Sequence, residues 1–345
     1  MALIAVIIVL FFNFVDTQSV WTQLSALDWR LALAASAMLV LALLLHGALW
    51  RHLLSNQVRL SSTFHAGNIC QAMNMWLPLR PGEPARIIIL GEDEAVSMAK
   101  VTGTVIVDRW LDNVMRLIFT AIAISIGLGV GSSAWTIGGA AFLVLAFLIL
   151  MLLMVRFRST ILATWPRHLA RIPKLSEDRA RHFLAGIVEG LQGVTSLRQL
   201  LILLGWAALV WISLAGYHFL TLRALGVSLE PRLMWTMALG TLALAPPTAA
   251  TQPGLYHASI VAPLTVVGFD PELLTAYAIV LHLLQNVWIT ALAVWGAIAA
   301  RESIGKVLSD VRGLFERGPA AETGARQAAE RSAEFEGAIP VTEEV

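Results

Sequence analysis

The chain has 345 residues, of which 57% are hydrophobic and 14% are charged, and its formal net charge is +1. This composition, with a mean hydropathy of +0.73, is far from that of soluble domains and excludes an ordinary soluble enzyme. The near-zero net charge carries no sign of a nucleic-acid partner, and none is expected. Because the alternating pattern of a transmembrane barrel is absent, we predict an all-α, polytopic transmembrane helix bundle.

Six segments are candidate membrane spans, since about twenty apolar residues cross the hydrocarbon core as a helix. They are residues 2–15, 31–50, 117–128, 137–155, 200–222 and 273–299. The first has no Lys or Arg before Arg30, so we interpret it as a membrane helix and not as a signal peptide. The third is expected to be the apolar end of a longer helix that begins near Ala95.

Two further apolar segments are each interrupted by a proline-glycine turn, Pro81-Gly82 in the first half and Pro253-Gly254 in the second. Paired interruptions in two halves are typical of transporters built from repeats, with the substrate site where the interruptions meet. At nearly the same offset in sequence, residues 107–114 align with residues 280–287, and four of eight positions are identical. The sequence therefore predicts an internal repeat.

Basic residues predict the orientation of the chain. Residues 156–198 carry eight Arg and Lys residues against three acids, which places them in the cytoplasm together with the C-terminus. The segment at 62–90 would then enter from the cytoplasm and the one at 232–267 from outside, as in an inverted repeat. Six spans with two re-entrant pairs fit this pattern, and eight shorter crossings are the alternative, so six to eight membrane helices are expected.

The expected organisation is a transmembrane domain over 1–300 and a disordered cytoplasmic tail over 301–345. Within the domain, the halves cover about 1–156 and 198–300. The linker at 157–197 mixes basic and apolar residues, which predicts amphipathic helices on the cytoplasmic surface.

Ionisable residues at membrane depth are the main candidates for function, because each costs about 2.5–3.5 kcal/mol at a helix centre on insertion scales. One helix carries Asp108, Arg109, Asp112 and Arg116 at spacings that allow pairing along one face. Two interpretations remain open. The cluster either pairs internally and locks the helices, or lines a hydrated cavity that contacts a headgroup.

Each interruption adds candidate substrate-binding residues. Arg80 and Arg86 carry guanidinium groups suited to phosphate, Gly82 permits a tight backbone, and Glu83 could hold an arginine or receive an amine. The alternative is a cytoplasmic turn whose arginines follow the positive-inside rule. The predicted substrate-binding set, completed by the preceding polar arm and the second half, is Asn74, Arg80, Gly82, Glu83, Arg86, Asp108, Arg109, Asp112, Gln252, Gly254, His257 and His282. Within it, Glu83 and Arg109 are expected to lie close together at one hydrated pocket.

No ATP-binding loop, metal-site spacing or catalytic motif occurs in the sequence. We therefore expect no enzyme activity, no metal and no cofactor. Asn68, Gln71 and Asn74 form a polar stripe at helical spacing, which indicates either hydrogen bonds between helices or the lining of a pore. His46 and His218 are expected to be hydrogen-bonded packing residues.

The pattern Leu77-Pro78, Arg80-Pro81-Gly82-Glu83-Pro84-Ala85-Arg86 and Val107-Asp108-Arg109 with Asp112 resembles the signature of the lysylphosphatidylglycerol synthase transmembrane-region family. The resemblance implies a multi-helix fold with internal repeats, and movement of a phospholipid or lipid-linked substrate between the leaflets of a plasma membrane. Asp108 stands where the family usually has Glu, His257 at an expected acidic position, and His282 where Arg is common. No transferase segment follows, so synthesis of lysyl-lipid is not expected.

The functional hypothesis is a flippase-like translocase in the cell membrane, with a membrane lipid as substrate and the lipid bilayer as surroundings. Two alternatives remain. One is a secondary transporter of a small anionic solute, and the other is a non-transporting membrane scaffold that partners a lipid- or glycan-modifying enzyme.

Overall fold

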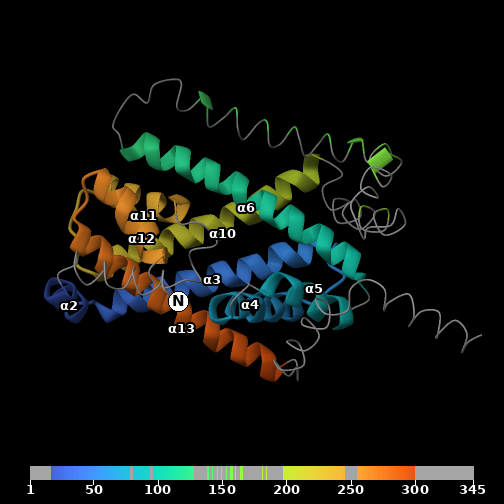
Figure 1. Ribbon diagram of the computed structural model, residues 1–345, viewed down its shortest axis with the longest axis horizontal. Coiled ribbons are helices and arrows are strands. Elements are labelled where there is room, and N and C mark those ends of the chain that lie inside the picture. Colours follow the sequence, from blue (N-terminus) through green and yellow to red (C-terminus); the bar gives the residue numbers. More distant parts are fainter. Residues whose placement is uncertain are drawn as a thin grey trace, which may run out of the picture. The chain divides into compact units, whose positions relative to one another are not determined.

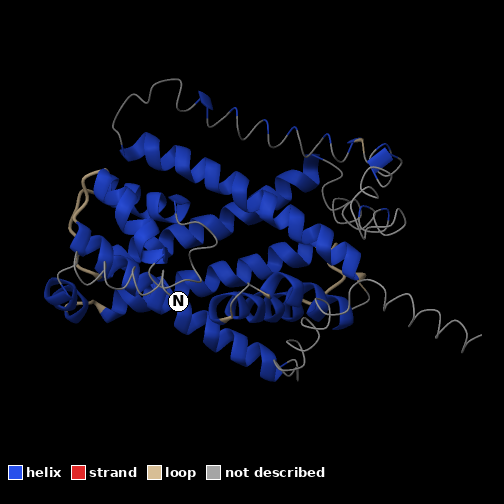
Figure 2. Ribbon diagram, viewed as in Figure 1, coloured by secondary structure: helices blue, strands red, loops and turns tan. Residues whose placement is uncertain are grey.

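The computed structural model describes residues 17–77, 81–93, 96–127, 197–244 and 255–299, together with scattered positions between 138 and 184. No strand occurs among these residues, and their regular elements are helices (Figure 2). The prediction of an all-α fold is therefore confirmed. The described helices belong to one compact unit, Met1–Arg301.

The first half comprises five described helices, shown from blue to green in Figure 1. They are α2 (Thr17–Ser25), α3 (Trp29–Leu53), α4 (Leu60–Trp76), α5 (Gly82–Asp93) and α6 (Met98–Gly127). Asp28 caps α3, because its Oδ1 accepts hydrogen bonds from the amides of Arg30 at 2.9 Å and Leu31 at 3.3 Å. The helix expected to begin near Ala95 begins at Met98, where the Ser97 hydroxyl oxygen accepts from the Lys100 amide at 3.2 Å.

The second half comprises α10 (Leu197–Ala224), α11 (Pro231–Leu244), α12 (Leu255–Val266) and α13 (Pro271–Ala299). Gly226 follows α10 with a φ of 72°, a left-handed conformation that favours glycine at a helix end. Asp270 precedes α13 and accepts a 2.7 Å hydrogen bond from the Leu273 amide, so α13 is capped by an aspartate in the same way as α3.

Three described helices are long and apolar enough to span a bilayer: Trp29–Leu53, Arg198–Ala224 and Pro271–Ala299. They correspond to the spans predicted at 31–50, 200–222 and 273–299. The prediction at 117–128 falls mainly on the end of α6. The span predicted at 2–15 and most of the one at 137–155 lie outside the described residues, as do most of the linker and the tail.

Both interrupted segments form pairs of short helices. Helix α4 ends at Trp76 before α5, and α11 ends at Leu244 before α12. Helices α5 and α12 have 12 residues each, or about 18 Å at 1.5 Å per residue, which is shorter than the roughly 30 Å hydrocarbon core. The structure thus agrees with the prediction that neither segment is a single continuous helix.

The two halves repeat each other in register and in packing. Helix α5 begins at Gly82 and α12 at Leu255, and the same offset in sequence separates the start of α6 at Met98 from that of α13 at Pro271. Helix α4 packs on α13, and its counterpart α11 packs on α6, while α3 and α10 pack along each other (Figure 1). In the repeat, α4 corresponds to α11 and α13 corresponds to α6. The pair α4–α13 is therefore the equivalent of the pair α11–α6, which supports the predicted repeat. Its inversion across the membrane stays a prediction.

Candidate functional site

A cavity of about 280 Å³ lies between the two halves. Residues from all eight helices of the repeats, α3 to α6 and α10 to α13, contribute to its lining. The polar side chains in that lining are His46, Gln71, Asn74, Arg86, Arg109, Asp112, Arg116, Tyr217, His218, Tyr256 and Gln285. Because these eight described helices all contribute, the cavity depends on how the two halves pack together.

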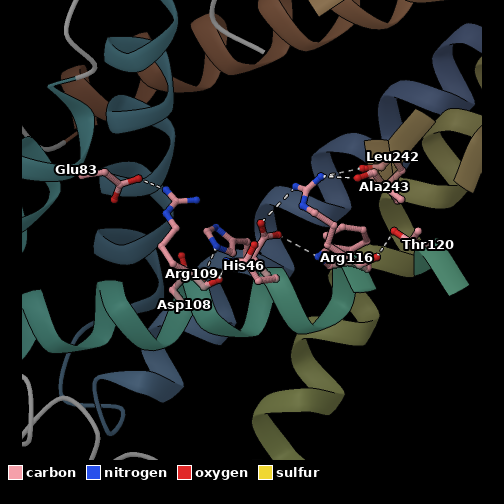
Figure 3. A network of polar contacts seen from close by, with 11 residues as sticks. His46, Glu83, Asp108, Arg109, Arg116, Thr120, Leu242 and Ala243 are labelled. Atoms are coloured by element: carbon pink, nitrogen blue, oxygen red, sulfur yellow. Dashed lines mark hydrogen bonds and ion pairs between the residues drawn. The ribbon is translucent and has the colours of Figure 1, made fainter. Parts of the chain in front are cut away.

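Glu83 and Arg109 form an ion pair that joins α5 to α6 (Figure 3). Their side chains are 30% and 46% exposed, so the pair is accessible. Glu83 lies in the first turn of α5, where the helix dipole favours a negative charge. Two predicted site residues from different elements are thus in direct contact.

Asp108 is buried beside two cationic or ionisable side chains from other helices. Its Oδ1 lies 3.0 Å from Nε2 of His46, and its Oδ2 lies 3.7 Å from Nη1 of Arg86. The Arg86 guanidinium also stacks over the Trp50 ring at 4.4 Å. A buried charge without partners is costly, so these contacts explain how Asp108 and Arg86 are tolerated there. The cluster connects α3, α5 and α6.

Arg86 has hydrogen-bond donors without a partner among the described residues. Its Nε and Nη1 atoms are buried and make no hydrogen bond to any residue that the structure describes. The whole residue is only 3% exposed, yet it belongs to the cavity lining. Arg86 therefore has the capacity to bind an anionic oxygen that enters the cavity.

Asp112 and Arg116 connect α6 with the second half. The Asp112 carboxylate accepts a 3.2 Å hydrogen bond from the Trp211 indole and lies 3.5 Å from Nη2 of Arg116. Arg116 also donates to the backbone carbonyls of Ala243 at 2.9 Å and Leu242 at 3.4 Å. Those carbonyls belong to the end of α11, whose last oxygens have no partner within the helix. Arg116 thus caps α11 immediately before the second interruption.

Helix α6 therefore contacts the helices next to both interruptions, α5 through Arg109 and α11 through Arg116. Arg109 and Arg116 are about two helical turns apart and lie on one face. Figure 3 shows the two side chains leaving α6 toward different partners, Glu83 in one direction and the Leu242 and Ala243 carbonyls in the other. The two interpretations of the charge cluster are consequently compatible, because Asp112 and Arg116 pair with each other and also line the cavity.

Gly82 and Asn74 meet at the first interruption. The Gly82 amide donates a 2.7 Å hydrogen bond to Oδ1 of Asn74. A Cβ atom at Gly82 would collide with the Cys70 carbonyl oxygen and would lie 2.6 Å from Cγ of Asn74. Only glycine fits this contact between α4 and α5 without displacement.

In the second half, His257 and His282 also come together, around Tyr256. The Tyr256 and His282 rings stack with centroids 4.9 Å apart, and the His257 ring stands edge-on to His282 at 5.2 Å. The offset of the repeat relates Glu83 to Tyr256 and Arg109 to His282, so an aromatic pair occupies the place of the ion pair. Tyr256 lines the cavity, whereas neither histidine belongs to the described lining.

The predicted polar stripe on α4 divides into two parts. Gln71 and Asn74 line the cavity, whereas Asn68 is buried and its amide donates to the Phe64 carbonyl within the same helix at 2.8 Å. Arg80, Gln252 and Gly254 lie outside the described residues. Substrate binding by the predicted set stays a prediction.

The predicted set does not include several lining residues: His46, Arg116, Trp211, Tyr256 and Gln285. For two of them a signal was available, since the offset of the repeat relates Tyr256 to Glu83 and Gln285 to Asp112. No local pattern distinguishes His46 or Trp211 from other residues of an apolar helix. The hydrogen bond of His46 agrees with its expected packing role, but its partner is the ionisable Asp108.

Comparisons with known proteins identify the family of the chain. No curated protein and no solved structure matches the chain significantly. The family model described as the lysylphosphatidylglycerol synthase TM region matches residues 1–293, in keeping with the apolar spans and the charged motif. The chain is a membrane protein that belongs to the lysylphosphatidylglycerol synthase transmembrane-region family.

Proposed function

We propose that this protein is a lipid translocase that moves a phospholipid or lipid-linked headgroup across the plasma membrane through the cavity between its two repeats. The observation that supports the proposal is the lining of that cavity, where three guanidinium groups, those of Arg86, Arg109 and Arg116, face a single carboxylate, that of Asp112. Glu83 and Asp108 pair with Arg109 and Arg86 from outside the lining, so what the cavity offers to an anion is guanidinium donors and not a net positive charge. Phosphate is the anion common to membrane lipids.

The size of the cavity supports a headgroup as the bound part. Pockets that enclose drug-sized ligands measure about 300–1,000 Å³, so 280 Å³ accommodates a headgroup and not the acyl chains. The chains would remain in the bilayer, where they need no change of solvent. Without an ATP-binding motif, the movement would be downhill or coupled to an ion.

Arg109 is the residue that we assign to first contact with phosphate. Its side chain is the more exposed member of the Glu83–Arg109 pair, and its guanidinium fork fits carboxylate and phosphate oxygens equally well. Phosphate would therefore compete with Glu83 for the same donors. This exchange allows a headgroup to enter and to leave.

We further propose that the C-terminus is cytoplasmic, as the basic segment 156–198 indicates, and that the protein is not an enzyme. A transporter of a small anionic solute would use the same arginines, and a scaffold for a lipid- or glycan-modifying enzyme would not need the cavity. The experiment below separates these functions.

The test is leaflet exchange of fluorescent phospholipids in vesicles that contain the purified protein. Wild type should accelerate exchange over empty vesicles, and Glu83→Gln and Arg109→Ala should each slow it. Glu272→Gln and Arg223→Ala are matched controls, because neither residue lines the cavity and Glu272, like Glu83, lies in the first turn of its helix.

The outcomes distinguish a lipid translocase from a solute transporter and from a scaffold. Absence of exchange for every lipid, with uptake of inorganic phosphate into the same vesicles, would indicate the solute transporter. Absence of both would favour the scaffold. Equal exchange in wild type and both site variants would overturn the role given to the Glu83–Arg109 pair.

A further inference from the structure

The cavity has two chemically different walls. The charged wall consists of Arg86, Arg109, Asp112 and Arg116, all on α5 and α6. The neutral wall consists of Tyr256 on α12, Gln285 on α13 and Gln71 on α4, the helix that packs on α13. Asp112 and Gln285 are equivalent in the repeat, so the same structural position is ionic on one side and an amide on the other.

The carboxylates at and beside the charged wall are engaged by arginines. Asp112 is the only carboxylate in the described lining, and it is already engaged by the Trp211 indole and the Arg116 guanidinium. Glu83 and Asp108, which lie outside that lining, are paired with Arg109 and Arg86. Phosphate that takes the place of Glu83 on Arg109 would release that carboxylate, so these pairs do not decide whether the headgroup also carries an amine.

Two aromatic rings of the cavity lining each have one face covered. The Arg116 guanidinium lies 5.4 Å from the Trp211 ring centroid, and His282 stacks on Tyr256 at 4.9 Å. Quaternary ammonium groups are recognised through open aromatic faces. These two contacts reduce the open aromatic surface that the described lining offers to a choline group.

The neutral wall has side-chain donors and acceptors without hydrogen-bond partners among the described residues. The side chains of Gln71 and Gln285 and the Tyr256 hydroxyl are not hydrogen-bonded to any residue that the structure describes. Buried or half-buried amides and phenols normally have partners. Groups that both donate and accept are suited to hydroxyls, which also do both.

We infer that the headgroup carries a phosphate whose substituent is hydroxylated, such as a glycerol, a cyclitol or a sugar. The phosphate would contact the charged wall and the hydroxyls would contact the neutral wall. This inference rests on the proposed lipid translocation and names its substrate class. A site built to bind hydroxyls discriminates against an analogue that lacks them, because its own polar groups are then left without partners.

The test compares four phospholipids that carry the fluorescent label on an acyl chain, so that each headgroup is native. Phosphatidylglycerol and phosphatidylinositol have a hydroxylated substituent, phosphatidylethanol has the same charge without hydroxyls, and phosphatidylcholine carries a quaternary ammonium. Exchange is measured in phosphatidylcholine vesicles with the wild-type protein. The two hydroxylated lipids should exchange faster than the other two by roughly two- to tenfold, the range for one net hydrogen bond.

Two variants locate the selectivity. Gln285→Leu and Tyr256→Phe should each slow the hydroxylated lipids toward the phosphatidylethanol rate and leave phosphatidylethanol unchanged. Gln57→Leu is the matched control, since Gln57 accepts a hydrogen bond from Lys100 in an exposed region and does not line the cavity. Tyr256→Phe removes only a hydroxyl, so it keeps the test open if Gln285→Leu does not fold.

The failure of this inference differs from the failure of the proposed function. Equal exchange of all four lipids, or faster exchange of phosphatidylcholine, would overturn the inference and leave translocation intact. Equal slowing of all four lipids in Gln285→Leu and Tyr256→Phe would show that the neutral wall is structural, which also overturns it. Absence of exchange for every lipid would refute translocation itself.

Discussion

Arg116 should be a major contributor to stability, because it caps the end of α11 from another helix. Arg116→Gln removes a guanidinium that donates to the carbonyls of Ala243 and Leu242 and lies 3.5 Å from Asp112. Hydrogen bonds that involve a charged group contribute about 1.5–3 kcal/mol. Because the side chain is 22% exposed, we expect a loss of about 2 kcal/mol, near the lower end.

The assay can use the single cysteine of the chain. Cys70 is buried at 1% exposure, so a thiol-reactive dye reports unfolding of the purified protein in detergent. A loss of about 2 kcal/mol lowers the midpoint by roughly 4–8 °C, because each kcal/mol corresponds to about 2–4 °C in the larger domains. Arg223→Gln, which changes an exposed arginine in the last turn of α10, is the matched control and should leave the midpoint unchanged.

A second variant distinguishes the contribution of the Arg116 contacts to the α11 carbonyls from that of the Asp112–Arg116 ion pair. Asp112→Asn removes the charge next to Arg116 but leaves both carbonyl contacts, so its shift should be less than half as large. An unchanged midpoint in Arg116→Gln, or an equal shift in Asp112→Asn, would refute the assignment of Arg116 as the cap of α11.

Two further variants test the first interruption by the same thermal assay. Gly82→Ala forces a Cβ onto the Cys70 carbonyl and should cost about 1–3 kcal/mol, whereas Gly67→Ala, where nothing lies within 4 Å, should not destabilise; equal midpoints would contradict the close approach. Asp108→Asn leaves Arg86 buried without its counter-charge and should cost about 3–5 kcal/mol. Adding Arg86→Met should restore part of that loss, and a purely additive double variant would show that the two residues are not coupled.

The interruptions and the charge cluster were predictable because their signals are local. Pro81-Gly82 stops a helix whatever surrounds it, and Asp108 and Arg109 stand out in any apolar sequence. The contact between Glu83 and Arg109, each from a different element, agrees with the expectation that they lie close together. The basis of that expectation was that ionisable side chains at membrane depth must flank one hydrated pocket.

The partners from α3 and α10 could not be predicted. His46 is far in sequence from Asp108, and Trp211 is far from Asp112, and both lie in ordinary apolar helices. Their contacts depend on how α3 and α10 pack along each other, which side-chain volumes determine and no short pattern reports. The repeat offered a route to Tyr256 and Gln285, through the equivalence of positions.

The two arginines on one face of α6 make that helix a mechanical link between both interruptions. A rotation of α6 about its axis would move the backbone of both arginines together, and with it their contacts to Glu83 and to the end of α11. Opening at one interruption alone would require Arg109 or Arg116 to release its partner first. A movement of this one helix would therefore disturb contacts at two distant points of the chain.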